Sequence, residues 1–406
     1  MAAGASGAEL DELADLLLTA GVAVVGSSVQ VRDRPHPNTY LGSGKLEEIR
    51  RLAREHDANL FVADDELTAR QERNLEKALG MPVIDRTTVI LDIFAGHAHS
   101  AEGKLQVELA QLQYNLARMR GLWTHLERLG GGIGTRGPGE SQIETDQRLA
   151  RNRIAALSRR LNAVRASRET MRAERERNRV PTVTLAGYTN SGKSSLMNAL
   201  TGAGVPVRDR LFETLDPTTR SMEVDGRQYL LTDTVGFIRK LPHQLVSAFG
   251  ATLEETLDAD LVLHVIDSSA PDKELAAMGR AVDEALGSLG HHDQELLLVA
   301  NKIDLADADR RRELRLALPG SIQVSAATGE GLDQLRDALS AAFAGRFEPV
   351  ELLVPYTDGE AIAAVHRMGG RVHREDRADG VLLRTSLPER LARRLRAYST
   401  VETVGG

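Results

Sequence analysis

The stretch Gly187–Ser194 reads GYTNSGKS, and it decides the fold of the region around it. It follows a short apolar run, Val183–Ala186, and precedes a helix-like stretch, Ser195–Leu200. A glycine-bounded loop that joins a strand to a helix and ends in Gly-Lys-Ser is typical of a phosphate-binding P-loop. The glycines let successive backbone N–H groups turn inward on anionic oxygens, and the helix adds its positive end. The pattern predicts that the phosphates of a nucleotide contact Gly187, Tyr188, Thr189, Asn190, Ser191, Gly192, Lys193 and Ser194.

The loop and the next motif carry separate chemical roles. Lys193 is expected to reach the β- and γ-phosphates as a catalytic residue, and the Ser194 hydroxyl is expected to ligate Mg²⁺. Downstream, the chain reads DTVG after an apolar strand. The carboxylate of this motif can hold Mg²⁺ through water, and its glycine, a second catalytic residue, lets a backbone N–H approach the γ-phosphate. The motif adds Asp233, Thr234, Val235 and Gly236 to the predicted site.

Two further motifs point to guanine. The chain reads NKID at Asn301–Asp304 and SAA at Ser325–Ala327, in the order of a small GTPase domain. The Asp304 carboxylate can accept hydrogen bonds from guanine N1–H and N2–H₂, a donor pair that adenine lacks. Asn301 and Lys302 are expected to orient that turn, and the backbone of SAA is expected to meet guanine O6. These motifs predict a GTP- and GDP-binding site that includes Asn301, Lys302, Ile303, Asp304, Ser325, Ala326 and Ala327.

Composition limits the class of protein. The chain has 406 residues, of which 42% are hydrophobic and 27% are charged, as in soluble globular proteins. It has no cysteine, so disulfides, zinc-thiolate sites and thiol chemistry are excluded. Its first residues lack the basic and apolar regions of a secretory signal, and no apolar run reaches the roughly 18 residues of a membrane span. We expect a cytoplasmic protein that is a monomer.

Charge is distributed unevenly along the chain. Net charge is −7, but residues 118–179 hold 15 arginines, no lysine and 7 acidic residues, so this stretch carries +8 and the remainder −15. A basic stretch in an acidic protein is typical of contact with a polyanion, and guanidinium groups suit phosphate oxygens. The alternative is a solvated helical surface of mixed charge. The all-arginine bias favours phosphate contacts.

The order of predicted elements indicates an α/β fold class with four domains. Strands alternating with helices in the first hundred residues predict a parallel sheet, with strands at 22–25, 60–62 and 82–85. The predicted domains are a small parallel α/β domain at 1–104, a basic antiparallel helical hairpin with a glycine-rich tip at 105–179, a P-loop GTPase domain at 180–346 and a small α+β domain at 347–406.

Two features of the first domain invite other interpretations. Residues Gly42–Lys45 read GSGK, but the first glycine and the final Ser or Thr of a P-loop are missing. We interpret it as a glycine turn that starts a helix; a weak second nucleotide or RNA contact is the alternative. His97 and His99 stand two residues apart without acidic or cysteine partners, which is poor geometry for a metal on one helix face.

Leucines predict the hairpin. Leu105, Leu109, Leu112, Leu116 and Met119 recur at 4-3-4-3 spacing, and a second 3-4-3 stripe comprises Ile154, Leu157, Leu161 and Val164. Such spacing is typical of a helix–helix seam. Between the stripes, residues 130–141 read GGGIGTRGPGES, where six glycines and a proline cannot continue a helix. This tip is longer than a connection needs and carries Arg136, so we predict that it contacts RNA; a flexible connection is the alternative.

The chain resembles the HflX family of ribosome-associated GTPases over nearly its whole length. The resemblance is carried by the motifs above together with YLGSGKLEEI at 40–49, EGKLQVELAQLQY at 102–114, GGGIGTRGPGESQIETDQR at 130–148 and LFETLDPTTR at 211–220. It implies a Mg²⁺-dependent GTPase that binds the large ribosomal subunit through the hairpin tip and acts in ribosome splitting and recycling or in the rescue of stalled ribosomes. The alternative is a GTPase of ribosome biogenesis or RNA modification.

The resemblance also implies a switch segment. It places Phe212, Glu213, Thr214, Leu215 and Asp216 at the nucleotide, with Thr214 as a catalytic residue and second protein ligand of Mg²⁺. Thr218 and Thr219 stay open as alternatives. Family members usually have a strand before the first helix, and this chain has only MAAGASGA there, so we expect the first sheet to lack that strand or the start to be misassigned.

Hydrolysis has one unusual feature. In many GTPases a glutamine after the DxxG glycine positions water, but this chain has Phe237, which cannot hydrogen-bond water. Intrinsic hydrolysis should therefore be slow. Asn190 is the type of residue that coordinates K⁺ in related GTPases lacking this glutamine, so K⁺ is a possible cofactor; the alternative is a turn-stabilising asparagine. A P-loop small-molecule kinase would not need NKID or SAA, and a nucleotide-independent RNA-binding protein would need none of these motifs.

Overall fold

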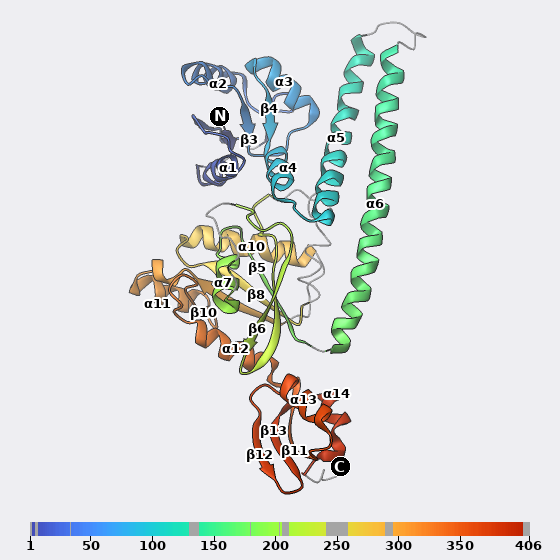
Figure 1. Cartoon of the computed structure of the whole chain (residues 1–406). Coiled ribbons are helices and arrows are strands. Elements are labelled where there is room, and N and C mark those ends of the chain that lie inside the picture. The colour runs from blue at the N-terminus through green and yellow to red at the C-terminus, as the bar shows by residue number, and fades with distance from the viewer. Residues whose placement is uncertain are drawn as a thin grey trace. The chain divides into compact units, whose positions relative to one another are not determined.

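The computed structural model describes residues 2–4, 7–32, 34–129, 138–178, 180–202, 204, 211–240, 259–288 and 295–400. Contacts divide the chain into two units. The first comprises residues 1–168, 208–216 and 238–253, and the second comprises 169–207, 217–237 and 254–406. Figure 1 labels most of their elements. In the described part of the chain, no helix combines the length and apolarity that crossing a membrane would require.

The first unit contains a four-stranded parallel sheet in the order β2-β1-β3-β4. Its elements are β1 (Ala2–Gly4), α1 (Gly7–Thr19), β2 (Ser27–Val29), α2 (Ser43–Glu55), β3 (Phe61–Ala63), α3 (Ala69–Leu79), β4 (Val83–Asp85) and α4 (Arg86–His97). Buried side chains of α2, α3 and the strands, among them Ile49, Phe61 and Leu75, form its core. The predicted parallel α/β domain is confirmed.

Two details of the prediction for this sheet were wrong. Residues 22–25 form no strand, because the chain is still turning out of α1 there: Gly21 has φ +77° and the Val22 N–H donates to Leu17 O at 2.8 Å. The strand begins later, at Ser27. The sheet also has the strand that we expected to be missing, because β1 pairs with both β2 and β3.

A buried ion cluster belongs to the first unit. The Arg86 guanidinium, 3% exposed, donates to Asp64 Oδ1 at 2.8 Å and also to Glu12. Lys240 Nζ donates to Asp64 Oδ2 at 2.8 Å, and Arg239 Nε donates to Glu12 Oε2 at 2.7 Å. Burial raises the pKa of the Asp64 carboxyl, and the charge of Arg86 opposes this shift. Residues that lie more than 150 positions apart in the sequence thus form one charge network.

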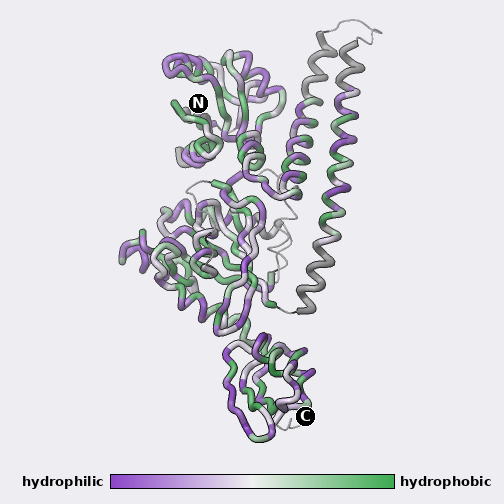
Figure 2. Tube along the Cα trace, viewed as in Figure 1, coloured by the Kyte–Doolittle hydropathy of each residue, from purple (hydrophilic) through white to green (hydrophobic). Residues whose placement is uncertain are grey.

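Two long helices form the predicted hairpin, α5 (Ala101–Leu129) and α6 (Pro138–Asn178), which lie side by side in Figure 1. Leu105 and Leu109 of α5 pack with Leu157 and Leu161 of α6, and Leu112 and Ile154 pack against them, so this part of the predicted seam is confirmed and antiparallel. The coloured part of α6 in Figure 2 carries both hydrophobic and hydrophilic residues. Of the predicted tip, residues 130–137, including Arg136, lie outside the described residues.

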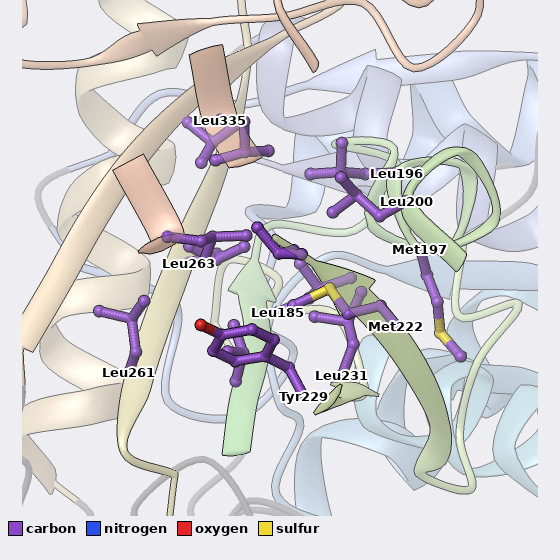
Figure 3. Packing of buried hydrophobic residues seen from close by; sticks show 14 of the residues in the cluster. Leu185, Leu196, Met197, Leu200, Met222, Tyr229, Leu231, Leu261, Leu263 and Leu335 are labelled. Carbon is purple, nitrogen blue, oxygen red and sulfur yellow. The ribbon is translucent and has the colours of Figure 1, made fainter. Parts of the chain in front are cut away.

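The second unit is built on a six-stranded sheet in the order β10-β9-β8-β5-β7-β6, parallel except for β6. Its core unites apolar residues of the strands with α7 and α12; Leu185, Leu196, Tyr229 and Leu263 are among those in Figure 3. The predicted GTPase fold is confirmed. The elements are β5 (Thr182–Gly187), α7 (Lys193–Thr201), β6 (Thr218–Val224), β7 (Arg227–Asp233), β8 (Leu261–Asp267), α10 (Asp272–Ser288), β9 (Glu295–Asn301), η1 (Ile303–Leu305), α11 (Ala308–Ala317), β10 (Ile322–Gln323) and α12 (Leu332–Ala344).

The C-terminal part is the predicted small α+β fold. Its antiparallel sheet has the order β11-β13-β12, and helices pack on it through Val365 and Leu391. Its elements are β11 (Phe347–Val354), α13 (Gly359–Met368), β12 (His373–Arg377), β13 (Gly380–Pro388), α14 (Glu389–Arg394) and η2 (Arg396–Tyr398).

Candidate nucleotide site

The predicted P-loop joins β5 to α7 at the carboxyl end of the central strand. Two positions of this loop must be glycine because there is no space for a Cβ atom. A Cβ on Gly187 would lie 2.2 Å from Val265 O, and a Cβ on Gly192, where φ is +87°, would lie 2.2 Å from Asn301 Nδ2. A side chain at Gly187 would displace the backbone of the neighbouring strand, and one at Gly192 would displace the Asn301 side chain. The sequence Gly-x₄-Gly is therefore a geometric requirement of this loop.

The remaining P-loop residues line a polar turn. Tyr188, Thr189 and Ser191 are buried, while Asn190 is exposed and adopts φ +61°. Among the residues that the structure describes, the buried hydroxyls of Thr189 and Ser191 have no hydrogen-bond partner. Buried polar groups in proteins normally have a hydrogen-bond partner. Two buried hydroxyls without one are therefore expected in a loop that binds a polar ligand.

Lys193 is folded back onto its own loop. Its Nζ donates to Gly187 O at 3.2 Å and Tyr188 O at 2.9 Å, and the side chain is buried. Burial lowers the pKa of Lys193 to about 8, and the negative charge of Asp233 opposes this shift. The ammonium group thus lies at the centre of the loop.

This pKa predicts a pH dependence of nucleotide binding. Phosphate oxygens favour charged Lys193 and raise its pKa, so binding takes up a proton wherever the pH exceeds about 8. The Kd for GDP should be nearly constant up to about pH 7, roughly double by pH 8 and then rise more steeply, approaching about tenfold per pH unit. Fluorescence titrations between pH 7 and 9 check this. Lys193→Met should bind GDP more weakly, and its Kd should not rise above pH 8. If the Kd rose equally steeply in both proteins, the pH dependence would belong to another group.

The DTVG motif packs directly against the P-loop. Ser194 Oγ donates to Asp233 Oδ2 at 2.6 Å, and Thr234 Oγ1 donates to Leu185 O at 2.9 Å, while Val235 is buried. A Cβ on Gly236 would lie 2.8 Å from Thr189 Cα and 2.9 Å from Lys193 Nζ. A hydroxyl and a carboxylate side by side are ligands that Mg²⁺ prefers, so the donor set fits that ion.

The backbone of Phe237 is hydrogen-bonded to the P-loop. Its N–H donates to Gly187 O at 3.1 Å, and its carbonyl accepts from Thr189 N at 2.7 Å. The side chain is 1% exposed. The residue after Gly236 is therefore a buried phenylalanine whose side chain offers no hydrogen-bonding group to a water molecule.

Asn301 links the predicted guanine motifs to the P-loop. Its Nδ2 donates to Ser191 O at 2.9 Å, and its Oδ1 accepts from Ala326 N at 3.1 Å. The N–H of buried Ile303 donates to Val324 O at 3.1 Å. One side chain thus holds the P-loop, NKID and SAA loops in register.

The other residues of these motifs flank this link. Lys302 adopts φ +61°, and its Nζ donates to Asp267 Oδ2 at 2.7 Å. Asp304 is exposed, Ser325 is buried with its Oγ accepting from Thr328 N at 3.1 Å, and Ala327 is exposed. The sequence interpretation missed Asp267, although a carboxylate at the end of β8, next to two motif-bearing strands, was a usable signal.

The predicted switch segment is described within the first unit. The Phe212 ring packs edge-on against Phe94 with centroids 4.7 Å apart, and Leu215 is buried. Asp216 Oδ2 accepts from His99 N at 2.8 Å and Ser100 N at 2.7 Å. Glu213 and Thr214 are half-buried. The nucleotide contacts predicted for this segment stay a prediction.

The histidine pair has structural contacts. His97 Nδ1 lies 2.8 Å from Ile93 O, and the backbone of His99 binds the carboxylate of Asp216. Within the described ranges, no group of three or more histidine and acidic residues is placed to hold a metal ion.

Comparisons with known proteins cover most of the chain. Three family models match: GTP-binding GTPase N-terminal over residues 7–95, GTP-binding GTPase Middle Region over 97–175 and 50S ribosome-binding GTPase over 182–302. The GTPase HflX of Lacrimispora saccharolytica is 48% identical over 384 residues, which cover 94% of this chain and 90% of that protein. The GTPase HflX of Escherichia coli is 46% identical over 357 residues, which cover 86% of this chain and 83% of that protein.

A solved structure is also similar in sequence. It is the crystal structure of a GTP-binding protein from Sulfolobus solfataricus in complex with GDP, 27% identical, which covers 85% of this chain and 99% of that chain with a TM-score of 0.44. The P-loop, DTVG and the first two residues of NKID lie within the range that the 50S ribosome-binding GTPase model matches. The chain is a GTP-binding GTP hydrolase that belongs to the HflX family of GTPases.

Proposed function

We propose that this GTPase binds the large ribosomal subunit under the control of GTP and acts in splitting and recycling ribosomes or in rescuing stalled ones. The observation that carries the proposal is the basic surface of α6, where Arg148, Arg151, Arg153, Arg159 and Arg160 are exposed. Guanidinium groups along an exposed helix suit the phosphates of ribosomal RNA. The name of the family model over the GTPase domain, 50S ribosome-binding GTPase, supports the same partner.

Sedimentation with large ribosomal subunits and a non-hydrolysable GTP analogue tests this proposal. Replacing Arg148, Arg151 and Arg160 together by Gln should weaken binding and reduce the slope of log Kd against log salt by about one for each phosphate that an arginine no longer neutralises. Intrinsic GTP hydrolysis should stay near normal. The matched control replaces Arg312 and Arg315, which are exposed on α11 of the GTPase domain. Equal subunit binding by both variants would overturn the role of α6.

In this proposal, the chain's own groups bind and orient the nucleotide. The backbone N–H groups of the P-loop surround the phosphates, and Lys193 moves from the two loop carbonyls to the β- and γ-phosphates. Ser194 and Thr214 would hold Mg²⁺, with Asp233 acting through water. Bound Mg²⁺ supplies positive charge that offsets the charge on the transferring phosphoryl group. The Asp304 carboxylate accepts from guanine N1–H and N2–H₂, and the backbone at Ser325 and Ala326 meets O6.

The burial of the Phe237 side chain supports slow intrinsic hydrolysis. A buried phenylalanine cannot orient the attacking water, so acceleration has to come from the ribosome or from another charge. Stimulation by ribosomes is therefore part of the proposal. It is measured as the ratio of turnover with and without ribosomal subunits.

We propose K⁺ as such an additional charge, held with the help of Asn190. The residue is exposed on the P-loop in the left-handed conformation, with its side chain on the loop that contacts the phosphates. Replacing K⁺ by Na⁺ at constant ionic strength should slow hydrolysis several-fold, because Na⁺ is smaller and differs in coordination. Asn190→Ala should remove the difference between the two salts. Equal wild-type rates in K⁺ and Na⁺ would refute this cofactor and leave the GTPase assignment intact.

A further inference from the structure

A single arginine outside the four motifs connects the two loops predicted to read guanine. Arg311 lies in the first turns of α11, and its Nη2 donates to Ile303 O at 2.8 Å while its Nε donates to Ala306 O at 3.1 Å. These two carbonyls flank Asp304 in the chain. The guanidinium therefore holds the turn that carries Asp304 from both sides.

The same guanidinium also reaches the SAA loop. Its Nη1 donates to Glu330 Oε1 at 2.5 Å and its Nη2 to Glu330 Oε2 at 3.2 Å. Glu330 belongs to that loop through its backbone, because its carbonyl accepts from Ser325 N at 2.8 Å. The Arg311 backbone adds a further tie, since its carbonyl accepts from Gln323 Nε2 at 2.9 Å, one residue before Val324. Arg311 thus bridges the loops on both sides of the base site.

We infer that Arg311, together with Glu330, is a positioning residue for guanine specificity, an inference that rests on the guanine site proposed above. Selection of guanine needs the Asp304 carboxylate and the Ser325–Ala326 backbone at a fixed separation, because both must meet edges of one rigid base. Asn301 fixes the two loops from the P-loop side, and Arg311 fixes them from the side of α11. Only a planar fork with several N–H groups can make these four bonds, so lysine is not an equivalent replacement.

Exposure argues against a purely stabilising role. The side chain of Arg311 is 29% exposed and that of Glu330 50% exposed, and ion pairs this exposed contribute little to folding stability. Their effect should instead appear where sub-ångström placement of a hydrogen-bonding group matters, in discrimination between bases. The bridge also contacts carbonyls on both sides of Asp304 and the loop whose backbone is proposed to meet guanine O6.

The test compares GDP with inosine diphosphate, which lacks the 2-amino group that Asp304 is proposed to accept from. In Arg311→Ala, the ratio of the two Kd values should fall at least about fivefold toward one, because a displaced carboxylate no longer reads that group. Arg311→Lys should fall between wild type and Arg311→Ala. Glu330→Gln should lower the ratio less, since Arg311 keeps its bonds to Ile303 O and Ala306 O. Arg312→Ala removes a neighbouring arginine whose guanidinium donates to Asp309, so it is the control and should match wild type.

The possible outcomes separate the claims. An unchanged ratio in Arg311→Ala, whether or not both Kd values rise together, would overturn the positioning role, because a scaffold effect weakens both ligands alike. Unchanged ratios in Glu330→Gln and Arg311→Lys would overturn it if Arg311→Ala failed to fold. A wild-type protein that binds the two nucleotides equally would instead remove the proposed guanine site. Thermal unfolding without nucleotide should differ little between wild type and Arg311→Ala.

Discussion

The Asp304→Asn variant is expected to bind GTP about 2–5 kcal/mol more weakly than the wild-type protein, because a charge-assisted pair with guanine is replaced by an amide that opposes the base's donors. Asp304 is exposed in the short helix η1, so the substitution should leave the empty protein folded. Isothermal titration or fluorescent-nucleotide displacement measures the change. GTP affinity within about threefold of wild type would contradict the assignment of this turn to guanine.

A rescue experiment sharpens that result. Xanthine carries a carbonyl where guanine carries the 2-amino group, so the asparagine amide of Asp304→Asn can donate to it. Xanthosine triphosphate should therefore bind the variant better than GTP does, whereas the wild-type protein should prefer GTP. A variant that has simply unfolded would bind neither nucleotide.

Lys193→Ala and Ser194→Ala should each lower Mg²⁺-dependent GTP hydrolysis by roughly 10²–10³-fold or more. The first removes the positive charge that the loop holds between two of its own carbonyls, and the second removes the hydroxyl next to Asp233. Loss of one preorganised group at a developing charge has an effect of about this size. Single-turnover phosphate release, with and without Mg²⁺, measures it. Arg336→Ala, on an exposed ion pair of α12, is the control, and wild-type turnover in either loop variant would place catalysis elsewhere.

The parts of the site that could be predicted are those fixed by local geometry. Gly187, Gly192 and Gly236 have no room for a Cβ, so the glycines of the P-loop and of DTVG could be recognised from the sequence alone. The helical seam was also predictable, because leucines that repeat about every 3.5 residues lie on one face of a helix and pack against a second helix.

Contacts between distant segments could not be predicted in the same way. Nothing near Asp216 in the sequence indicates that it accepts from the backbone at His99 and Ser100, and nothing near Arg311 indicates Glu330 as its partner. The strand β1 was missed because an Ala-Ala-Gly segment contributes backbone hydrogen bonds without a hydrophobic pattern. Such elements are specified by their neighbours.

The ion cluster of the first unit has a consequence for the order in which the protein can fold during synthesis. Glu12 and Asp64 are synthesised early. Arg239 and Lys240 are synthesised only after the P-loop and the strands β5 to β7. Until then Arg86 alone offsets two buried carboxylates, so the early sheet cannot reach its final stability. Domains usually fold in the order of their synthesis. Here the first unit must wait for its own later segment, and a fragment that stops before residue 238 should be less stable than the same residues within the whole chain.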